Sequence, residues 1–461
     1  MFSADIYIQR RNRLKTQLKS GLAFFPGNKE SPMNYAANQY HFRQDSSFLY
    51  FFGLDSPGLA GVIDVDDGTE AIFGNEIDIE DIIWMGALPS VKERAEAVGV
   101  KKTFPLNALR DELKKALDRR RAVHYLPPYR TEASRMIEKL LGISPESVRA
   151  GSSADLIQAV VAQRSFKSGE EVAEIEKALD ITYDMYAAAM SMAHPGRYER
   201  EIVGAMEGLA RARGGLVAFP PIVSINSQIL HNNAYGNRLK KGRLLVMDAG
   251  AESARHYGSD ITRTIPVGGE FTARQKDVYD IVLDAQMRAI QAVRPGAAFK
   301  DLHLQTSRTI AAGLKDIGLM KGDTGEAVGQ GAHALFFPHG LGHMLGLDVH
   351  DMESLGEDNV GYDPSVPRSE QFGLAYLRMA KELRPGHVMT IEPGIYFIPA
   401  LIDKMRNENK FLDFVRYDKL EKYGNFGGVR IEDNILVTDK GHRLLGKSIP
   451  KTPADIRKAV G

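Results

Sequence analysis

The stretch PHGLGHMLGLDVHD, residues 338–351, places His339, His343 and His350 on a backbone rich in glycine. With His333 just upstream, four of the 12 histidines of the chain fall within 18 residues. A single histidine is most often a core side chain. A cluster on glycine-rich backbone, which can approach a ligand closely, favours a binding site instead.

Four acidic residues stand on either side of this stretch in short, distinctive settings. They are Asp248 in LLVMDAG, Asp260 in YGSDITRT, Glu392 in TIEPGIYF and Glu432 in GGVRIEDN. Together with His343 they make an oxygen-rich ligand set, which suits two hard or borderline divalent ions better than one zinc among thiolates. Glu432 stands in an apolar strand pattern, where a carboxylate is costly to bury unless it is paired or binds metal. Paired metals activate water, so the pattern favours a hydrolase.

The composition sets broad limits on the protein. A chain of 461 residues is long enough for two or three domains. Its hydrophobic fraction of 43% and charged fraction of 26% are ordinary for globular proteins. Basic and acidic residues balance at 59 each, which gives no electrostatic case for nucleic acid or an anionic membrane as partner. No cysteine, apolar signal region or membrane-length apolar run is present, which predicts a cytoplasmic protein.

Residues 1–165 have the pattern of an α/β domain. Helical spacing covers Tyr7–Lys19 and returns at 91–97, 106–117 and 132–141. Four apolar runs of strand length are bounded by turn residues: Leu22–Phe25, Ser47–Phe52, Gly61–Val65 and Ala71–Phe73. The turn Asp66-Asp67-Gly68 predicts a hairpin between the last two runs.

Residues 166–461 form the second predicted domain, in which strands carry the acidic residues and helices separate them. Ser168 and Glu171 have capping-box spacing at its start. The predicted helices are 170–192, 199–213, 273–293 and 299–317, and the predicted strands are 244–247, 261–267, 388–391 and 429–437. Two loosely patterned segments, 352–372 and 400–424, are expected to be loops at the rim of a cleft.

These motifs, with ILHNNAY at 229–235, resemble the pita-bread metallopeptidases, which include aminopeptidase P, prolidase and methionine aminopeptidase. FRQDSSFLYFFG at 42–53 and IIWMG at 82–86 resemble the companion domain of aminopeptidase P and prolidase, which methionine aminopeptidase lacks. The resemblance implies an α/β fold class: an N-terminal α/β domain (1–165) followed by a pita-bread catalytic domain of pseudo-twofold α+β structure (166–461).

The resemblance also implies roles for individual residues. Two divalent ions, expected to be Mn²⁺, would be bound by Asp248, by the bridging Asp260 and Glu432, and by His343 and Glu392. Glu392 would also shuttle a proton, His231 and His350 would steady the oxyanion, and His339 would line the pocket. Arg430 stands two residues before Glu432, so it either orients Asp248 or is an exposed strand arginine. Trp84 is either a core aromatic or, in a homodimer or larger oligomer, lies near a neighbour's active site.

The implied substrates are peptides with proline in second position. Proline forms a tertiary amide without an N–H, so a general aminopeptidase site handles it badly. The 42–53 motif favours an aminopeptidase P, which removes the first residue from longer peptides. YLRMAKELRPG at 376–386 and the insertion after Glu392 favour a prolidase, with Arg378 as carboxylate clamp or else a solvated helix arginine. A non-catalytic protein on the same fold is disfavoured because all five ligand positions are intact.

Overall fold

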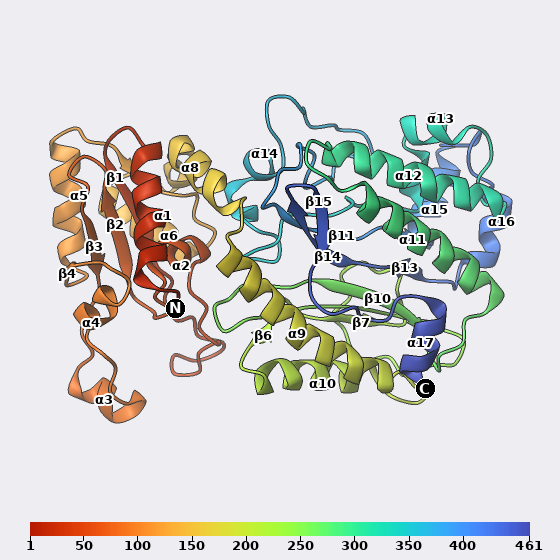
Figure 1. Ribbon diagram of the computed structural model, residues 1–461, viewed down its shortest axis with the longest axis horizontal. Helices are drawn as coiled ribbons and strands as arrows, with labels where there is room; N and C mark the ends of the chain where they lie inside the picture. Colours follow the sequence, from red (N-terminus) through yellow and green to blue (C-terminus); the bar gives the residue numbers. More distant parts are fainter. The chain divides into compact units, whose positions relative to one another are not determined.

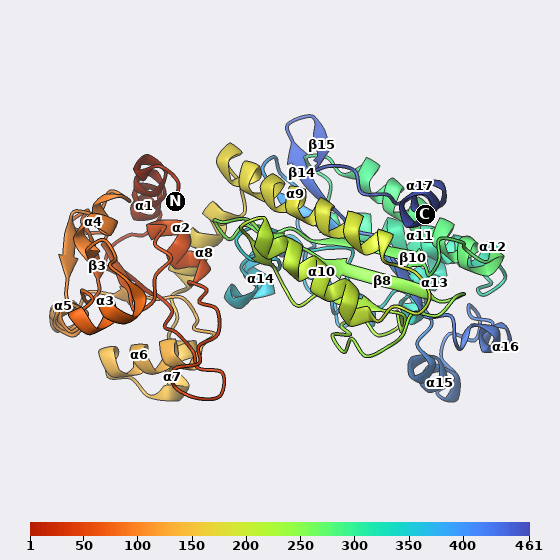
Figure 2. The same ribbon diagram turned by 90° about the horizontal axis from the view of Figure 1, so that it is seen from below.

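The computed structural model describes all 461 residues. They form two compact units (Figures 1 and 2). The N-terminal unit contains Met1–Arg164 together with Glu353–Asn359, and the C-terminal unit contains Ser165–Met352 and Val360–Gly461. The short segment Glu353–Asn359 therefore belongs to the N-terminal unit although it follows the histidine-rich stretch in sequence.

The N-terminal unit combines short helices with one mixed sheet. Its helices are α1 (Ala4–Gln17), α2 (Ser46–Phe52), α3 (Ile79–Met85), α4 (Val91–Glu96), α5 (Ala108–Asp118), α6 (Thr131–Leu141), α7 (Pro145–Ala150) and α8 (Ala154–Arg164), with η2 (Glu353–Leu355) and most of α14 (Glu357–Val360). Its strands are β1 (Leu22–Pro26), β2 (Ala60–Asp64), β3 (Glu70–Phe73), β4 (Lys102–Phe104) and β5 (Val123–His124), in the order β4-β3-β2-β1-β5. The predicted hairpin is present as the antiparallel pair β2 and β3.

The prediction of a strand over Ser47–Phe52 is wrong, because this segment forms helix α2. Asp45 caps the helix by accepting a hydrogen bond from the N–H of Phe48, and Gly53 ends it in the left-handed conformation. Every residue of α2 is buried, so no amphipathic period marks it in the sequence. A short apolar run of this kind does not distinguish a buried helix from a buried strand.

The C-terminal unit holds the four long helices and the strands that carry the acidic motifs. Its helices are α9 (Gly169–Ser191), α10 (Glu199–Ala212), α11 (Ala273–Ala292), α12 (Phe299–Asp316), α13 (Thr324–Gly329), α15 (Pro399–Asn407), α16 (Tyr417–Leu420) and α17 (Pro453–Val460), with the 3₁₀ turns η1 (Ala332–Leu335) and η3 (Glu421–Tyr423). Its strands are β6 (Leu216–Val217), β7 (Ile222–Ser224), β8 (Leu244–Ala249), β9 (Ala251–Glu252), β10 (Ile261–Pro266), β11 (Val388–Ile391), β12 (Gly394–Tyr396), β13 (Gly428–Arg430), β14 (Asp433–Thr438) and β15 (Gly441–Leu444). The expected loop at 400–424 is thus partly helical.

The long helices come as two neighbouring pairs, α9 with α10 and α11 with α12, which run side by side in Figure 1. Each pair is joined by a Pro-Gly turn, at Pro195-Gly196 and at Pro295-Gly296, and both glycines have a positive φ. Antiparallel strands follow each pair, in sheets of order β10-β8-β7 and β11-β14-β15. The predicted capping box of Ser168 and Glu171 starts the first pair.

The strands of the second half change partners at two acidic residues. The predicted continuous strand 429–437 is broken at Ile431-Glu432 into β13, which pairs with β12, and β14, which pairs with β11. The chain between β11 and β12 is broken at the same level, at Glu392-Pro393. The N–H of Glu432 donates to the carbonyl of Thr262 at 3.0 Å, which links this break to β10. Glu392 and Glu432 therefore both lie where the chain passes from a strand of one sheet to a strand of another sheet.

Helix α3 differs from all the long helices, since none of its residues is buried. A reciprocal capping box between Asp78 and Asp81 holds its first turn. Among the helices of the whole chain, none combines the length and apolar character needed to span a bilayer.

Candidate metal centre

The five predicted ligands lie on strands and loops that meet in the C-terminal unit. Asp248 is near the end of β8, and Asp260 directly precedes β10, its antiparallel neighbour. Glu392 and Glu432 stand at the two strand breaks, and His343 lies in the loop after η1. The N–H of Glu392 donates to the carbonyl of Leu341 at 2.8 Å, and the N–H of Thr390 donates to the carbonyl of His343 at 3.0 Å. These bonds fix the histidine loop against β11.

Three of the side chains form a tight cluster. One ligand atom each of Asp260, His343 and Glu432 lies within 4.8 Å of the other two, and all three residues are buried. The other two predicted ligands adjoin the cluster: Glu392 Oε1 lies 3.8 Å from His343 Nε2, and the charge of Asp248 acts directly on Asp260. The structure thus brings all five predicted ligands together.

The Nε2 nitrogen of His343 faces carboxylate oxygens of the cluster. Nδ1 of His343 lies 3.0 Å from the carbonyl of Met344, which can only accept a hydrogen bond, so in the neutral ring Nδ1 carries the proton. Its Nε2 is then a lone-pair acceptor, and it lies 3.4 Å from Asp260 Oδ2. Acceptor facing acceptor is unfavourable, and a cation between the two atoms reconciles them.

The carboxylates carry more negative charge than the protein itself neutralises. Burial, then the charge of Asp248, raises the pKa of Asp260 well above its usual value, and burial, then Asp260, does the same to the pKa of Glu432. Burial also raises the pKa of Glu392. Asp248 Oδ1, Asp260 Oδ1 and Glu432 Oε1 are buried without a hydrogen-bond partner. Orphaned anionic oxygens beside a lone-pair nitrogen fit divalent cations.

Arg430 is the one guanidinium that enters this cluster. Its Nη2 donates to Asp248 Oδ2 at 2.6 Å, its Nη1 to the hydroxyl of Tyr396 at 2.8 Å and its Nε to the hydroxyl of Thr262 at 3.2 Å. It is buried, so the structure does not place it as an exposed strand arginine. Thr262 in turn donates its hydroxyl to Glu432 Oε2 at 2.7 Å. Two of the predicted ligand carboxylates, those of Asp248 and Glu432, are therefore oriented through one guanidinium and one hydroxyl.

His339 is tied into the same network from the other side. Its Nδ1 lies 2.8 Å from the carbonyl of Gly340 and its Nε2 lies 2.9 Å from the hydroxyl of Tyr396. Since a carbonyl only accepts, Nδ1 donates and Nε2 accepts from Tyr396. Burial and the charge of Arg430 lower the pKa of His339 to about 3, so the ring is neutral. Both of its nitrogens have partners within the protein.

The four remaining predicted residues lie in four different settings. The ring centroid of His350 is 4.4 Å from that of His343, at 75°. His231 as a whole residue is exposed, but partial desolvation of its ring and then the charge of Arg430 lower its pKa, against the opposing charge of Asp248. Arg378 lies in a turn segment, and its charge also acts on Glu392. Trp84 belongs to the N-terminal unit and is 79% exposed, which excludes a core aromatic.

The sequence analysis gave no role to Tyr396, Thr262 or Asn434. Asn434 donates its amide to the carbonyl of Asp260 and accepts from the N–H of Asp260 at 3.0 Å, which holds that backbone in place. Strand periodicity could have found Thr262, since it stands two residues after Asp260 on β10. No local signal marks Tyr396, whose role depends on its distance from Arg430.

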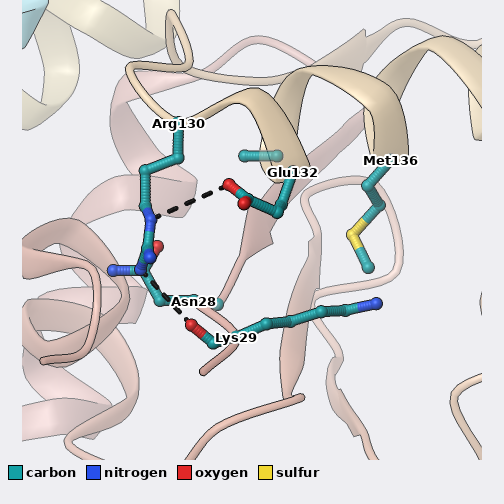
Figure 3. A pocket seen from close by; sticks show the side chains of 7 residues that line it. Asn28, Lys29, Arg130, Glu132 and Met136 are labelled. Carbon is teal, nitrogen blue, oxygen red and sulfur yellow. Dashed lines mark hydrogen bonds and ion pairs between the residues drawn. The ribbon is translucent and has the colours of Figure 1, made fainter. Parts of the chain in front are cut away.

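A hollow also lies in the N-terminal unit (Figure 3). It is lined by Gly27, Asn28, Lys29, Arg130, Glu132, Ala133 and Met136. Arg130 bridges it, with Nη1 donating to the carbonyl of Lys29 at 3.4 Å and Nε 4.0 Å from the carboxylate of Glu132. Its lining contains no histidine and a single carboxylate, Glu132, and so lacks the clustered ligand set of the C-terminal unit.

Comparison with known protein families divides the chain in the same way, into an N-terminal and a C-terminal part. The model of metallopeptidase family M24 matches residues 173–439, and that of the aminopeptidase P N-terminal domain matches residues 7–125. Fold and ligand set define a metallopeptidase with a pita-bread catalytic domain preceded by an α/β domain. The chain belongs to metallopeptidase family M24, in its aminopeptidase P and prolidase group.

Individual relatives cover almost the whole chain. The Xaa-Pro aminopeptidase of Escherichia coli K12 is 30% identical over 98% of this chain and 97% of its own length. The Xaa-Pro dipeptidase of Homo sapiens is 32% identical over 91% of this chain and 84% of its own length. The solved structure of E. coli aminopeptidase P with the inhibitor Pro-Leu has a TM-score of 0.81 and 29% identity, covering 100% of this chain and 98% of that one. Proline aminopeptidase P II from Yersinia pestis gives a TM-score of 0.82 at the same identity, covering 100% and 99%.

Proposed function

We propose that the protein is an Xaa-Pro aminopeptidase, which uses two divalent ions to hydrolyse the bond between the first residue of a peptide and a proline in second position. The observation that carries this proposal is the buried cluster of Asp260, His343 and Glu432, with carboxylate oxygens that have no protein partner. The relatives that span the chain support the Xaa-Pro bond as its target. Manganese is proposed as the metal because the donors are mainly oxygen. A cytoplasmic location stays a prediction from the sequence.

In this proposal Asp248, Asp260, His343, Glu392 and Glu432 would hold the metals. When bound, the ions acidify a water molecule and polarise the scissile carbonyl. Glu392 has a carboxylate that is 19% exposed, at the edge of the cluster, and a pKa raised by burial. It is therefore suited to pass a proton to the leaving nitrogen of proline. Arg430 acts by orienting Asp248, and His339 acts through Tyr396.

His350 and His231 are proposed to contact the substrate carbonyl as negative charge develops on it. We expect His350→Ala to lower kcat about 10²- to 10³-fold with little change in KM, because a donor that stabilises only the transition state acts on kcat. Steady-state kinetics on an Xaa-Pro-Yaa-Zaa peptide under Mn²⁺ measures both constants. A variant in which only KM rises would assign His350 to plain substrate binding.

The choice between aminopeptidase and prolidase depends on the end of the substrate. A prolidase must bind the free carboxylate of a dipeptide, and Arg378 is, after Arg430, a second arginine whose charge acts on both Glu392 and His231. For an aminopeptidase we expect Xaa-Pro-Yaa-Zaa to be cut and Arg378→Ala to change its turnover little. For a prolidase the same variant loses dipeptide turnover about ten- to a hundredfold, since a charge-assisted hydrogen bond contributes roughly 1.5 to 3 kcal/mol.

The exposed Arg384 in the same segment gives the matched control, Arg384→Ala, which should leave both substrates unaffected. Rates on the dipeptide and the tetrapeptide are compared for the wild type and both variants. Efficient cleavage of Xaa-Pro with intact Xaa-Pro-Yaa-Zaa would overturn the aminopeptidase proposal in favour of prolidase. No cleavage of either peptide by the manganese-loaded wild type would favour the non-catalytic alternative.

A homodimer or larger oligomer is proposed from helix α3. Ile79, Ile83, Trp84 and Met85 are each more than 60% exposed on this one helix, an apolar patch typical of an interaction site. We propose that Trp84 lies near the active site of a neighbouring subunit. Sedimentation velocity at micromolar concentration should give a dimer or larger, and Trp84→Ala should weaken it. Because Trp84 is the only tryptophan, its emission should shift to the red on dilution. A wild-type monomer would contradict the proposal.

A further inference from the structure

The last residue of the histidine-rich stretch, Asp351, belongs to a buried ion pair. Nζ of Lys167 donates to Asp351 Oδ2 at 2.9 Å, and each side chain is only 1% exposed. Asp351 is the residue after His350, whereas Lys167 comes from the start of the C-terminal unit, far away in sequence. Neither residue belongs to the metal ligand set.

The pair closes an arch of the chain, residues 344–351, which begins after His343 and ends after His350. The N–H of Asp351 donates to the carbonyl of Met344 at 3.0 Å, which joins the two feet of the arch. Within the arch the N–H of Gly346 donates to the carbonyl of Asp348 at 3.0 Å. The side chain of His350 is therefore carried by a closed loop whose last residue is the anion of the pair.

Both partners of the pair are anchored to strand β11. The N–H of Lys167 donates to the carbonyl of Gly386, just before β11, at 2.8 Å. On the other side, the N–H of Leu345 donates to the carbonyl of Val388, within β11, at 3.0 Å. The ion pair thus completes a closed set of contacts. β11 bonds to the arch, the arch ends at Asp351, Asp351 pairs with Lys167, and Lys167 bonds to the chain just before β11. β11 leads directly into Glu392, so these contacts connect the arch to the strand that precedes this predicted ligand.

The arch passes close to the pair at Gly346. A Cβ atom at Gly346 would lie 2.6 Å from Asp351 Oδ2 and 2.9 Å from Cε of Lys167. The arch therefore approaches the pair as closely as glycine allows. Asp351 directly follows His350, whose ring centroid lies 4.4 Å from that of His343, so the carboxylate is held one residue from the histidine.

A buried ion pair is weak evidence for stabilisation, because the cost of taking both charges out of water offsets their attraction. A well-packed apolar pair of similar volume is often as stable. A better physical reason than stability for keeping two buried charges here is that their pairing holds the chain in one geometry.

We propose that Lys167 and Asp351 are positioning residues, whose buried ion pair holds the 344–351 arch so that His350 is correctly oriented toward the substrate. This inference rests on the proposed function, in which His350 contacts the substrate carbonyl. Neither residue touches the substrate, so their effect on the reaction passes entirely through His350.

The test uses the double variant Lys167→Met/Asp351→Leu, which removes both charges of the pair together. We expect its Tm and its metal-induced gain in Tm to stay close to those of the wild type, while kcat falls about 10²-fold, the loss that a displacement of about 1 Å can cause. In a His350→Ala background the same double substitution should lower kcat no further, because the histidine through which it acts is gone. Arg121→Met, which breaks the partly buried pair with Asp64 in the N-terminal unit, is the control and should leave kcat unchanged.

Two results would overturn the positioning role: unchanged kcat in the double variant, or an equal fall of kcat in the presence and absence of His350. If the double variant does not fold, Asp351→Asn is measured in the same two backgrounds and read by the same criterion. Failure of the proposed function is seen separately, as absence of turnover in the wild type. In that case a crystal structure of the double variant decides the positioning role, which requires His350 to be displaced from its 4.4 Å contact with His343.

Discussion

Glu432→Ala should abolish peptide hydrolysis and leave the fold intact. Glu432 supplies one buried oxygen without a protein partner and a second held by Thr262, so its loss removes a proposed metal ligand. Loss of an outer partner of a metal ligand typically costs about 10- to 100-fold in affinity or activity, and loss of a direct ligand should cost more. Kcat, metal content and circular dichroism measure the three expectations. A fully active Glu432→Ala enzyme would refute the proposed metal centre.

The same variant should change how stability responds to metal and pH. Wild-type Tm should rise on adding Mn²⁺, with about 2.7 kcal/mol expected at a hundredfold excess over Kd, and Glu432→Ala should lose most of this gain. Without metal, burial and Asp260 raise the pKa of Glu432 above its ordinary 4.5, so the folded state binds more protons than the unfolded state. The wild type therefore loses stability relative to the variant as the pH rises above about 4.5.

The neighbouring Asp433 provides the control. It is equally buried, but although burial opposes its charge, Arg263 and Lys451 lower its pKa. Arg263 Nη2 donates to Asp433 Oδ1 at 2.6 Å. Asp433→Ala should therefore lower Tm with and without metal and should keep the metal-induced gain. If both variants keep that gain, Glu432 does not bind the metal.

Arg430→Met should be the second severe substitution. It removes the only guanidinium of the cluster and leaves Asp248 buried beside other carboxylates without a cation. Breaking a buried pair by removing one partner typically costs 3–5 kcal/mol, so a marked fall in Tm is expected, larger in metal-free than in metal-loaded protein. Metal affinity should also fall about 10- to 100-fold, because Asp248 loses the donor that orients it. Thermal unfolding at a series of Mn²⁺ concentrations measures both effects.

Arg430→Lys should not rescue the enzyme. Three nitrogens of Arg430 donate to three different partners, and a lysine ammonium has one nitrogen and cannot reproduce this planar fork. Arg443→Met is the matched control, since Arg443 forms an exposed pair with Glu176 in the same unit, and such pairs contribute at most about 1 kcal/mol. Wild-type metal affinity in Arg430→Lys would show that only the positive charge matters.

The sequence determined the family, the long helices and the identity of the clustered ligands. Helices such as α9 and α11 begin at a capping box and end shortly before Pro-Gly, which local patterns reveal. The four acidic residues stood out because each lies within an apolar strand pattern or beside one. An ionisable side chain in such a place requires a partner, and these four residues together with the clustered histidines were enough to predict a shared site.

Tertiary structure alone decided how these residues act on one another. The strand break at Glu432, the fork of Arg430 and the pair of Lys167 with Asp351 join residues that are far apart in sequence, and no local periodicity encodes them. Helix α2 was misread for a related reason, since burial on all sides erases the pattern that separates helix from strand. A sequence records which side chains need a partner. Which partner each one receives depends on distances that exist only after the sheets and loops have packed.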